Sequence, residues 1–591
     1  MGDFLRDVIF CDTEVYAYDW LVCYKFKNGE QISFHNDRRA LIEFVVKHKD
    51  DITVGYNIRH YDQYIIQAIC AGVEPKFVND QIIKYKKRGW EVLKNKSVPK
   101  FVFFDVMTEQ IGLKKLEAHM GLSIIETSVP FDIDRPLTEE ELAEVEEYCW
   151  ADVNALETVF YERIEEFKNH ALLINKFDLP ISHFKLTKAQ LVAEIVDAKR
   201  RIPTDDEFEI EIPENLRIEK YHHVVDWFLS PESSVLNEKG KPYRQNNFKI
   251  GGVNHTVAWG GMHSTDLMVC WRWSPDSGEE KMLVLDVKSY YPTIIILYHL
   301  MSRAVENIDR YVEAYWERLE LKAKKDPVAN ALKVLLNTFF GTTIYEFSKS
   351  YDPRMGRNIC AFGQLFLLDL LEKLEPYCKP INSNTDGLCI HPLNADCTKK
   401  CMEICEEWQK RTGFELEFKN LIGCFQRDVN SYIWVTDEEE NNVKAIGAFK
   451  LPSSLKCDLG IIPIVLQDYF VHGILVNESI SANKGNLQLF QRIVSVGEHE
   501  GFIDEFGKDL PYKVIRWFPI TKPEMAVHVK WKKDEKGDGI PNVTSKGIIL
   551  NGEILGKKCP EWLDFEYYAR MCRDQIKEIE TSAFQKTLSD W

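Results

Sequence analysis

Short apolar runs that end in an acidic residue occur at two places in the chain. Residues 8–11 precede Asp12, and residues 282–285 precede Asp286. Such runs, bounded by polar residues, are typical of buried strands. Helical patterns and a further strand at residues 101–104 follow the first run. This mixture of short strands and helices predicts an α/β unit in the N-terminal third of the chain.

Two helical patterns follow the second strand. Apolar residues recur at helical spacing, first at Ile308, Tyr311, Val312, Tyr315 and Leu319, and then at Val328, Leu332, Leu335 and Phe339. Asp326 and Pro327 separate them, and a proline at that place should force a turn. The pattern therefore predicts a helical hairpin. A long helix at about residues 359–374 should follow, and then a β-hairpin whose turn lies within residues 382–387.

The composition indicates a folded protein with several domains. The chain has 591 residues, which at about 150 residues per domain suggests roughly four units. An apolar share of 45% with 28% charged residues excludes a largely disordered chain. The longest apolar run, at residues 290–301, is too short for a membrane helix, and the N-terminus lacks a secretion signal. The fifteen cysteines are therefore expected to be reduced, with Cys397, Cys401 and Cys405 on a buried helix face rather than at a zinc site.

The net charge gives little information about the partner. There are 74 basic and 92 acidic residues, a balance of −18, which by itself argues against a nucleic-acid ligand. An acidic enzyme can still carry one local basic channel, and carboxylates that bind metal ions add to the negative total. The motifs must therefore decide the function.

The first group of motifs is acidic. Asp12 and Glu14 are two residues apart after a strand, so both lie on one side of it. Three motifs occur in order: Asp12-Thr13-Glu14, then Gly55-Tyr56-Asn57 with Tyr61-Asp62, then Tyr148 and Asp152 on an acidic helix. Together they resemble the exonuclease motifs of the DEDD-type 3′→5′ proofreading nucleases, in the tyrosine branch. Each motif alone would more often be structural.

This resemblance implies a role for each residue. Asp12, Glu14, Asp62 and Asp152 would hold two divalent cations, and Tyr148 would orient the attacking water. Asn57 and Tyr61 would bind the last nucleotides of a frayed strand, the tyrosine by stacking. A lysine from residues 112–116 would contact the phosphate, and the sequence leaves open whether it is Lys114 or Lys115.

The second group of motifs follows the second strand. It consists of Asp-Val-Lys-Ser-Tyr-Tyr-Pro at 286–292, Lys-Val-Leu-Leu-Asn-Thr-Phe-Phe-Gly at 333–341 and Asn-Thr-Asp-Gly at 384–387. In this order they resemble motifs A, B and C of the family B DNA polymerases, most closely the short polymerases of bacteriophages. The resemblance extends from the N-terminus to about Lys450.

The family resemblance implies a second site with two Mg²⁺ ions, or Mn²⁺ in their place. Asp286, Asp386 and the Val287 carbonyl would bind the metals. Tyr291 would exclude a 2′-hydroxyl, with Tyr290 as the less favoured gate. The residues expected to bind the nucleotide are Ser289, Tyr290, Tyr291, Arg318, Lys322, Lys333 and Asn337. Those expected to bind DNA, besides Asn57 and Tyr61, are Gly260, Gly261, Phe340, Gly341, Tyr432 and Lys450.

The sequence departs from the family pattern at three places. Asn384 replaces the usual first aspartate of motif C, although Asp386 keeps the place of the firm metal ligand. Thr338 and Phe340 replace a serine and a tyrosine. Asn430 stands where the family has the lysine of a Lys-x-Tyr motif, so either Arg427 or Lys444 is expected to supply that charge.

The predicted architecture is a ribonuclease H-like exonuclease domain followed by a right-hand polymerase. The expected boundaries are 1–185 for the exonuclease, 186–280 for a connecting and N-terminal palm region, 281–303 and 342–450 for the palm, 304–341 for the fingers and 451–591 for the thumb. The expected partners are primer-template DNA, deoxynucleoside triphosphates, and a phage or host helicase and single-strand-binding protein. We expect a monomer in the cytoplasm of an infected bacterium, without contact to a membrane.

Two alternatives remain at this point. Asn384 and Asn430 allow a polymerase-like DNA-binding protein whose catalysis has been weakened or lost. A protein-primed phage polymerase is the other alternative. Asp286 and Lys333 are 47 positions apart, and Asn337 and Asp386 are 49 apart, which leaves little room for the insertions that such enzymes carry between the motifs.

Overall fold

Strands and helices are interspersed along the chain, as the sequence predicts. The computed structural model describes residues 8–235, 237–238, 244–265, 267–439, 442–533 and 537–589. They form two compact units. Unit 1 contains the described residues up to Leu186 together with Pro452–Ile461 and Ile480–Tyr568, and unit 2 contains the remainder. The expected fold class is thus confirmed as a mixed α/β chain with more than one domain.

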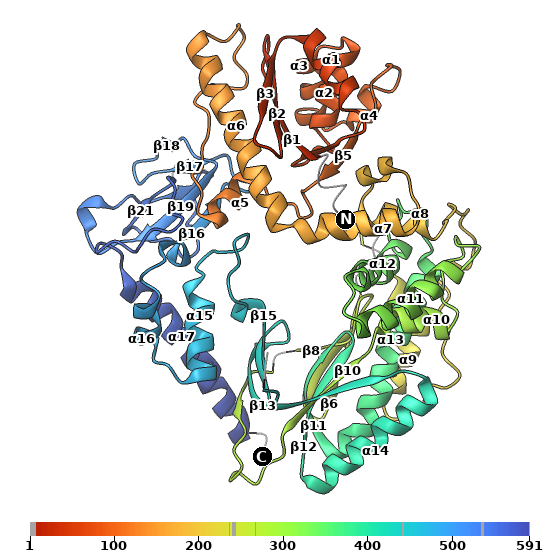
Figure 1. Ribbon diagram of the computed structural model, residues 1–591. Coiled ribbons are helices and arrows are strands. Elements are labelled where there is room, and N and C mark those ends of the chain that lie inside the picture. The colour runs from red at the N-terminus through yellow and green to blue at the C-terminus, as the bar shows by residue number, and fades with distance from the viewer. Residues whose placement is uncertain are drawn as a thin grey trace. The chain divides into compact units, whose positions relative to one another are not determined.

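A five-stranded mixed sheet is the centre of unit 1, with strand order β3-β2-β1-β4-β5 (Figure 1). Three strands are antiparallel: β1 (Val8–Val15), β2 (Trp20–Phe26) and β3 (Gln31–His35). Two more strands, β4 (Ile52–Gly55) and β5 (Val102–Asp105), continue the sheet in parallel with β1. The strands expected at residues 8–11 and 101–104 are therefore confirmed.

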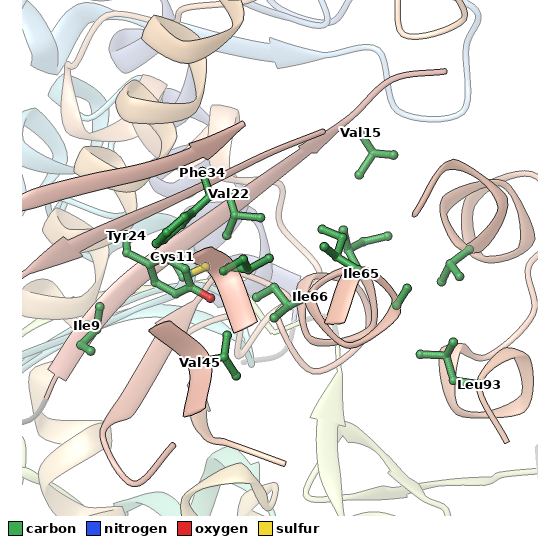
Figure 2. Packing of buried hydrophobic residues seen from close by; sticks show 14 residues of the cluster. Ile9, Cys11, Val15, Val22, Tyr24, Phe34, Val45, Ile65, Ile66 and Leu93 are labelled. Atoms are coloured by element: carbon green, nitrogen blue, oxygen red, sulfur yellow. The ribbon is translucent and has the colours of Figure 1, made fainter. Parts of the chain in front are cut away.

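The side chains of β1 alternate between two helical layers. Ile9, Cys11 and Val15 belong to the hydrophobic cluster shown in Figure 2, which also includes Ile65 of α2 (Asp62–Ala71) and Val45 of α1 (Arg38–Lys47). The next residue in the strand, Phe10, instead packs against Phe160 of α6 (Glu139–Glu162), with ring centroids 5.4 Å apart. Because a strand alternates its side chains, Asp12 and Glu14 project to the side of α6.

The C-terminal part of unit 1 adds two small three-stranded sheets. The strands are β16 (Arg492–Ser495), β19 (Val514–Pro519) and β21 (Gly547–Ile549) in one sheet, and β17 (Phe502–Ile503), β18 (Asp509–Leu510) and β20 (Lys530–Trp531) in the other. Ile493 and Val514 of these strands share a buried cluster with Ala118 of α5 (Leu113–Met120) and with Ile124. The C-terminal part and the N-terminal part of this unit are therefore joined by a small buried cluster.

Unit 2 is built on a ten-stranded sheet. Its central strand β10 (Met282–Val287) lies between β12 (Gly387–Pro392) and β13 (Leu416–Asp428). The other strands are β6 (Asn246–Ile250), β7 (Val253–Val257), β8 (His263–Thr265), β9 (Val269–Arg272), β11 (Cys378–Asn384), β14 (Ser431–Thr436) and β15 (Val443–Ile446). The expected hairpin at residues 382–387 is confirmed, because β11 pairs with β12.

Helices of unit 2 confirm the predicted patterns. A helical hairpin forms from α11 (Asp309–Ala323) and α12 (Val328–Thr343), and the Tyr311 hydroxyl donates to the Leu336 carbonyl at 3.2 Å across it. The long helix α13 (Pro353–Leu374) is buried along nearly its whole length. Cys401 and Cys405 are buried on α14 (Ala395–Thr412), as expected, and Cys397 is half-buried.

The remaining helices belong to one unit or pass between the two. In the N-terminal part of unit 1 they are α3 (Pro75–Ile83), α4 (Gly89–Val92) and α7 (Ile164–Lys176). Unit 2 also contains α8 (Lys188–Ile195), α9 (His222–Leu229), α10 (Tyr290–Leu297) and most of α16 (Val476–Ala482). Two further helices, α15 (Ile461–Gln467) and α17 (Phe565–Ser589), pass from one unit into the other. Among the described helices, none combines the length and the apolar character that a membrane crossing requires.

Candidate active sites

Three carboxylates converge in unit 1. Asp12 and Glu14 come from β1 and Asp152 from α6, and one oxygen of each lies within 4.8 Å of the others. The strand alternation described above turns both β1 carboxylates toward α6. Carboxylate oxygens are the preferred ligands of hard divalent cations. This acidic triad, Asp12, Glu14 and Asp152, could therefore hold a metal ion.

Asp62, the fourth carboxylate expected at this site, lies outside the triad. It is the first residue of α2 and accepts a hydrogen bond of 2.7 Å from the hydroxyl of Thr13. Thr13 projects from β1 to the side opposite Asp12 and Glu14, which explains the separation. Burial raises the pKa of Asp62 to about 7. Its charge also contributes to the raised pKa of Asp12, so it remains electrostatically close to the triad.

The surroundings of the acidic triad disfavour the ionised form of its carboxylates. Burial, followed by the charge of Asp152, raises the pKa of both Asp12 and Glu14. Burial likewise raises the pKa of Asp152 itself, against the lowering effect of Lys114. Like charges held together away from water favour protonation unless a cation neutralises them. The donor set and its electrostatics thus fit a bound divalent cation.

Lys114 is the lysine that reaches the acidic triad. Its ammonium donates to Asp152 and, at 3.2 Å, to Glu117, and it lies 4.5 Å from the centre of the Tyr148 ring. Lys115, the alternative, acts electrostatically on His119 instead. Glu117 was not expected from the sequence. Burial raises its pKa to about 8, and its place one turn after Lys114 on α5 was the available signal.

The other residues expected in the nuclease site lie around β4 and α2. Asn57 has a left-handed backbone (φ 66°), and its N–H donates to the Asp105 carboxylate at 3.0 Å. Asp105 ends β5 and so fixes the loop after β4. The Tyr61 hydroxyl donates to the Asn79 side chain at 2.7 Å, while its ring packs against the core cluster. Tyr148, one turn before Asp152, has a pKa raised by burial.

Two aspartates converge in unit 2. Asp286 on β10 pairs with Gly387 of β12, and the N–H of Val287 donates to the Asp386 carbonyl at 2.9 Å. A Cβ atom added at Gly387 would overlap the Asp286 carboxylate, so an alanine at this position would displace that side chain. Asp286 is half-buried, whereas Asp386 is exposed at the turn. Partial desolvation raises the pKa of both aspartates, and the charge of Asp286 raises that of Asp386 further. The pair therefore also suits a divalent cation.

Lys444 is the basic residue that faces these two aspartates. Its charge lowers the pKa of both, and it stands on β15 with its ammonium 5.1 Å from the centre of the Trp434 ring. Arg427, the other candidate, pairs with the neighbouring Asp428 at 3.0 Å. The ring of Tyr432 stacks on Trp434 with centroids 4.2 Å apart.

The start of α10 brings three of the expected nucleotide-binding residues together. Ser289 has a left-handed backbone (φ 47°), and its hydroxyl accepts a 2.7 Å hydrogen bond from Arg318 of α11. Tyr290 is buried, and its hydroxyl donates to the Gly363 carbonyl at 2.6 Å. Tyr291 is half-buried and donates to the Gly260 carbonyl at 2.9 Å. Of the two tyrosines, Tyr291 is therefore the one that can meet a ligand.

One face of α12 is aligned with this region. The ring of Phe340 stacks on Tyr291, with centroids 4.5 Å apart and an interplanar angle of 24°. Lys333, Asn337 and Gly341 recur at helical spacing and are exposed. The stripe expected from the sequence consists of Lys333, Asn337 and Phe340, of which Phe340 is half-buried. Lys322 of α11 is exposed too, 3.9 Å from Glu417.

The glycine pair expected to contact DNA lies against the turn of the β11–β12 hairpin. Thr385 in that turn donates its N–H to the Met262 carbonyl at 3.1 Å. A Cβ at Gly261 would approach the Thr385 Cα to 3.0 Å, whereas one at Gly260 would meet nothing. Lys450 is exposed beyond β15, and no described contact joins it to the aspartates.

Among the described residues, each unit thus contains one group of neighbouring carboxylates that could hold a metal ion, buried or half-buried in unit 1 and more exposed in unit 2. The acidic triad of unit 1 is accompanied by Lys114 and Tyr148, and the aspartate pair of unit 2 by Lys444 and Tyr291. A comparison of the sequence with known protein families finds no family model that matches, and a comparison with curated proteins finds none that is significantly similar.

Proposed function

We propose that this protein is a template-directed DNA polymerase with a 3′→5′ proofreading exonuclease, of the family B type found in bacteriophages. The observation that carries the proposal is the pair of separate acidic centres. Each centre includes at least one carboxylate from a β-strand and is accompanied by its own basic and aromatic side chains. One centre suits phosphodiester hydrolysis and the other nucleotidyl transfer, because both reactions depend on metal ions that neutralise phosphate charge.

In the nuclease site, Asp12, Glu14 and Asp152 would hold Mg²⁺, with Asp62 close by. Bound cations supply Lewis acidity and a water of lowered pKa. Tyr148 orients the attacking water through its hydroxyl, and Lys114 offsets part of the negative charge of the site. The loop that carries Asn57 and Tyr61 binds the 3′ end of the strand.

In the polymerase site, Asp286, Asp386 and the Val287 carbonyl would hold Mg²⁺. Bound cations there supply charge neutralisation for the triphosphate and activation of the primer hydroxyl. The triphosphate is bound by Arg318, Lys322 and Lys333, which α11 and α12 carry.

Next to this site, the aromatic gate consists of Tyr291 on Phe340. The stacking contact and the hydrogen bond to Gly260 hold the Tyr291 ring in place. A fixed ring blocks the space that a 2′-hydroxyl would need, so the gate favours deoxynucleotides over ribonucleotides. Asn337, on the same face of α12, contacts the nascent base pair.

Several features of the fold support the proposed division into nuclease, palm and fingers domains. Three antiparallel strands followed by two parallel ones, with a carboxylate-bearing helix on one face, support a ribonuclease H-like nuclease domain. An antiparallel sheet with one aspartate on β10 and another in the adjacent β11–β12 turn, together with a helical hairpin, supports a palm and fingers. The short connections between the motifs favour a nucleic-acid primer over a protein primer.

Primer extension tests the proposal directly. A DNA primer labelled at its 5′ end and annealed to a longer template is incubated with the protein and Mg²⁺. We expect elongation when all four deoxynucleoside triphosphates are present and stepwise shortening when they are omitted. A DNA-binding protein with weakened or lost catalysis, the alternative suggested by Asn384 and Asn430, would retain the primer but leave its length unchanged.

A further inference from the structure

The C-terminal layer of unit 1, here defined as residues 480–568, is hydrogen-bonded to the segment that contains Lys114. Arg516 of β19 is fully buried, and its guanidinium donates to the carbonyls of Ala118 and Leu122 at 3.2 and 2.8 Å. It also donates to the Gln491 side chain at 2.8 Å. Ala118 belongs to α5, the helix of Lys114. The buried guanidinium therefore fixes the C-terminal layer against α5.

A second connection fixes the start of β19. One oxygen of the Glu126 carboxylate accepts the backbone N–H groups of Lys513 at 2.8 Å and Val514 at 3.4 Å. Close by, the N–H of Ile124 donates to the Asn551 carbonyl at 2.8 Å. These contacts determine where the backbone of Lys513 lies relative to the N-terminal part of unit 1.

The side chain of Lys513 extends toward the nuclease site. Its ammonium lies 5.5 Å from the centre of the Phe131 ring, and that ring stacks on Tyr16 with centroids 5.4 Å apart. Tyr16 directly follows β1 and is two residues from Glu14. Burial and the Asp152 carboxylate raise the pKa of Glu14, whereas Lys114 and Lys513 lower it. Lys513 is thus a second ammonium group close to the acidic triad.

Lys114 and Lys513 differ in their exposure and in the ion pairs that they form. Lys114 is half-buried and already paired with Asp152 and Glu117. Lys513 is exposed, and within the described part of the chain its ammonium forms no ion pair. An exposed ammonium beside a site that must accept a polyanion is free to bind a phosphate, and most protein contacts to nucleic acid are of this kind.

We propose that the C-terminal layer forms one side of the nuclease site and that Lys513 binds a phosphate of the DNA strand being degraded. This inference rests on the proposed nuclease function. It assigns part of substrate binding to a residue far from the exonuclease motifs in sequence. Because the contact is to the backbone of the strand, it should be independent of base sequence.

The test compares three variants of the full-length protein. Lys513→Ala removes the charge, Lys513→Arg keeps it, and Lys546→Ala removes an exposed lysine of the same layer that no described contact joins to the acidic triad. The readouts are KM and kcat for 3′→5′ degradation of single-stranded DNA at saturating Mg²⁺, and the salt dependence of DNA binding. We expect Lys513→Ala to raise KM about two- to fivefold and to make the log–log salt slope shallower by about 0.7. Lys513→Arg and Lys546→Ala should stay close to wild type.

The outcomes separate this inference from the proposed function. If the wild-type protein does not shorten DNA at all, the nuclease function itself is wrong. If wild type degrades DNA and Lys513→Ala matches Lys546→Ala in KM and salt slope, the assignment of Lys513 is overturned. It is also overturned if Lys513→Ala is defective only at subsaturating Mg²⁺ and has an unchanged KM for DNA, because Lys513 would then act only through Glu14. Circular dichroism and thermal melting show whether each variant is folded like wild type.

Discussion

Replacement of Gly387 by alanine should disable the polymerase site through one added methyl group. The new Cβ would overlap the Asp286 carboxylate and approach the Leu285 carbonyl oxygen to 3.2 Å. Backbone atoms in a paired strand cannot yield easily, so the carboxylate must move by about 1 Å to restore a normal contact. A displacement of about 1 Å in a reacting group costs on the order of 10²-fold in rate. We therefore expect Gly387→Ala to lower kcat for synthesis about 100-fold.

The two activities provide an internal control for this variant. Elongation is measured by rapid quench with a labelled primer and saturating deoxynucleotides, and degradation is measured on single-stranded DNA without them. Because the acidic triad lies in unit 1, degradation by Gly387→Ala should match wild type. Gly485→Ala is a matched control, since a Cβ there would meet no other atom. Synthesis at the wild-type rate by folded Gly387→Ala would show that the position of Asp286 is not critical, and would refute its assigned role.

Three further predictions follow from the same geometry. Tyr291→Ala should raise ribonucleotide incorporation relative to deoxynucleotides, and an active variant with unchanged discrimination would place the gate elsewhere. Gly261→Ala should impair synthesis because its Cβ would press on the neighbouring hairpin turn, whereas Gly260→Ala should keep most activity; equal defects in the two variants would contradict this reasoning. Burial raises the pKa of Asp62 to about 7 and that of Glu117 to about 8, so in the metal-free protein these two groups bind more protons in the folded than in the unfolded state between about pH 4 and pH 8. The melting temperature of the metal-free protein should therefore fall as the pH rises through this range, and added Mg²⁺ should make the decrease smaller. A melting temperature that stays constant over this pH range in EDTA would contradict the raised pKa values of the two acids.

Local patterns were sufficient to predict the elements that carry the sites. The apolar run before Asp12 predicts a strand, and its period of two predicts that Glu14 shares the side of Asp12. The spacing of Lys333, Asn337 and Phe340 likewise predicts that these residues share one face of a helix. These features depend on neighbouring residues alone, so they are readable without knowledge of the tertiary fold.

Choices that depend on tertiary contacts could not be made from the sequence. Lys114 and Lys115 are adjacent, and only the packing of α5 against α6 shows which one reaches Asp152. The pairing of β15 with β14 was needed to favour Lys444 over Arg427. The hydrogen bond from Thr13 to Asp62 places that carboxylate on the face of β1 opposite Asp12 and Glu14, and no sequence motif indicates this contact.

Separate metal sites for synthesis and degradation are the central claim of this account. The most direct measurement compares Asp386→Ala with the double variant Asp12→Ala, Glu14→Ala on one labelled primer-template. We expect Asp386→Ala to lose elongation and keep 3′→5′ degradation of single strands, and the double variant to show the reverse. Loss of both activities in either folded variant, or retention of both in either, would contradict the account.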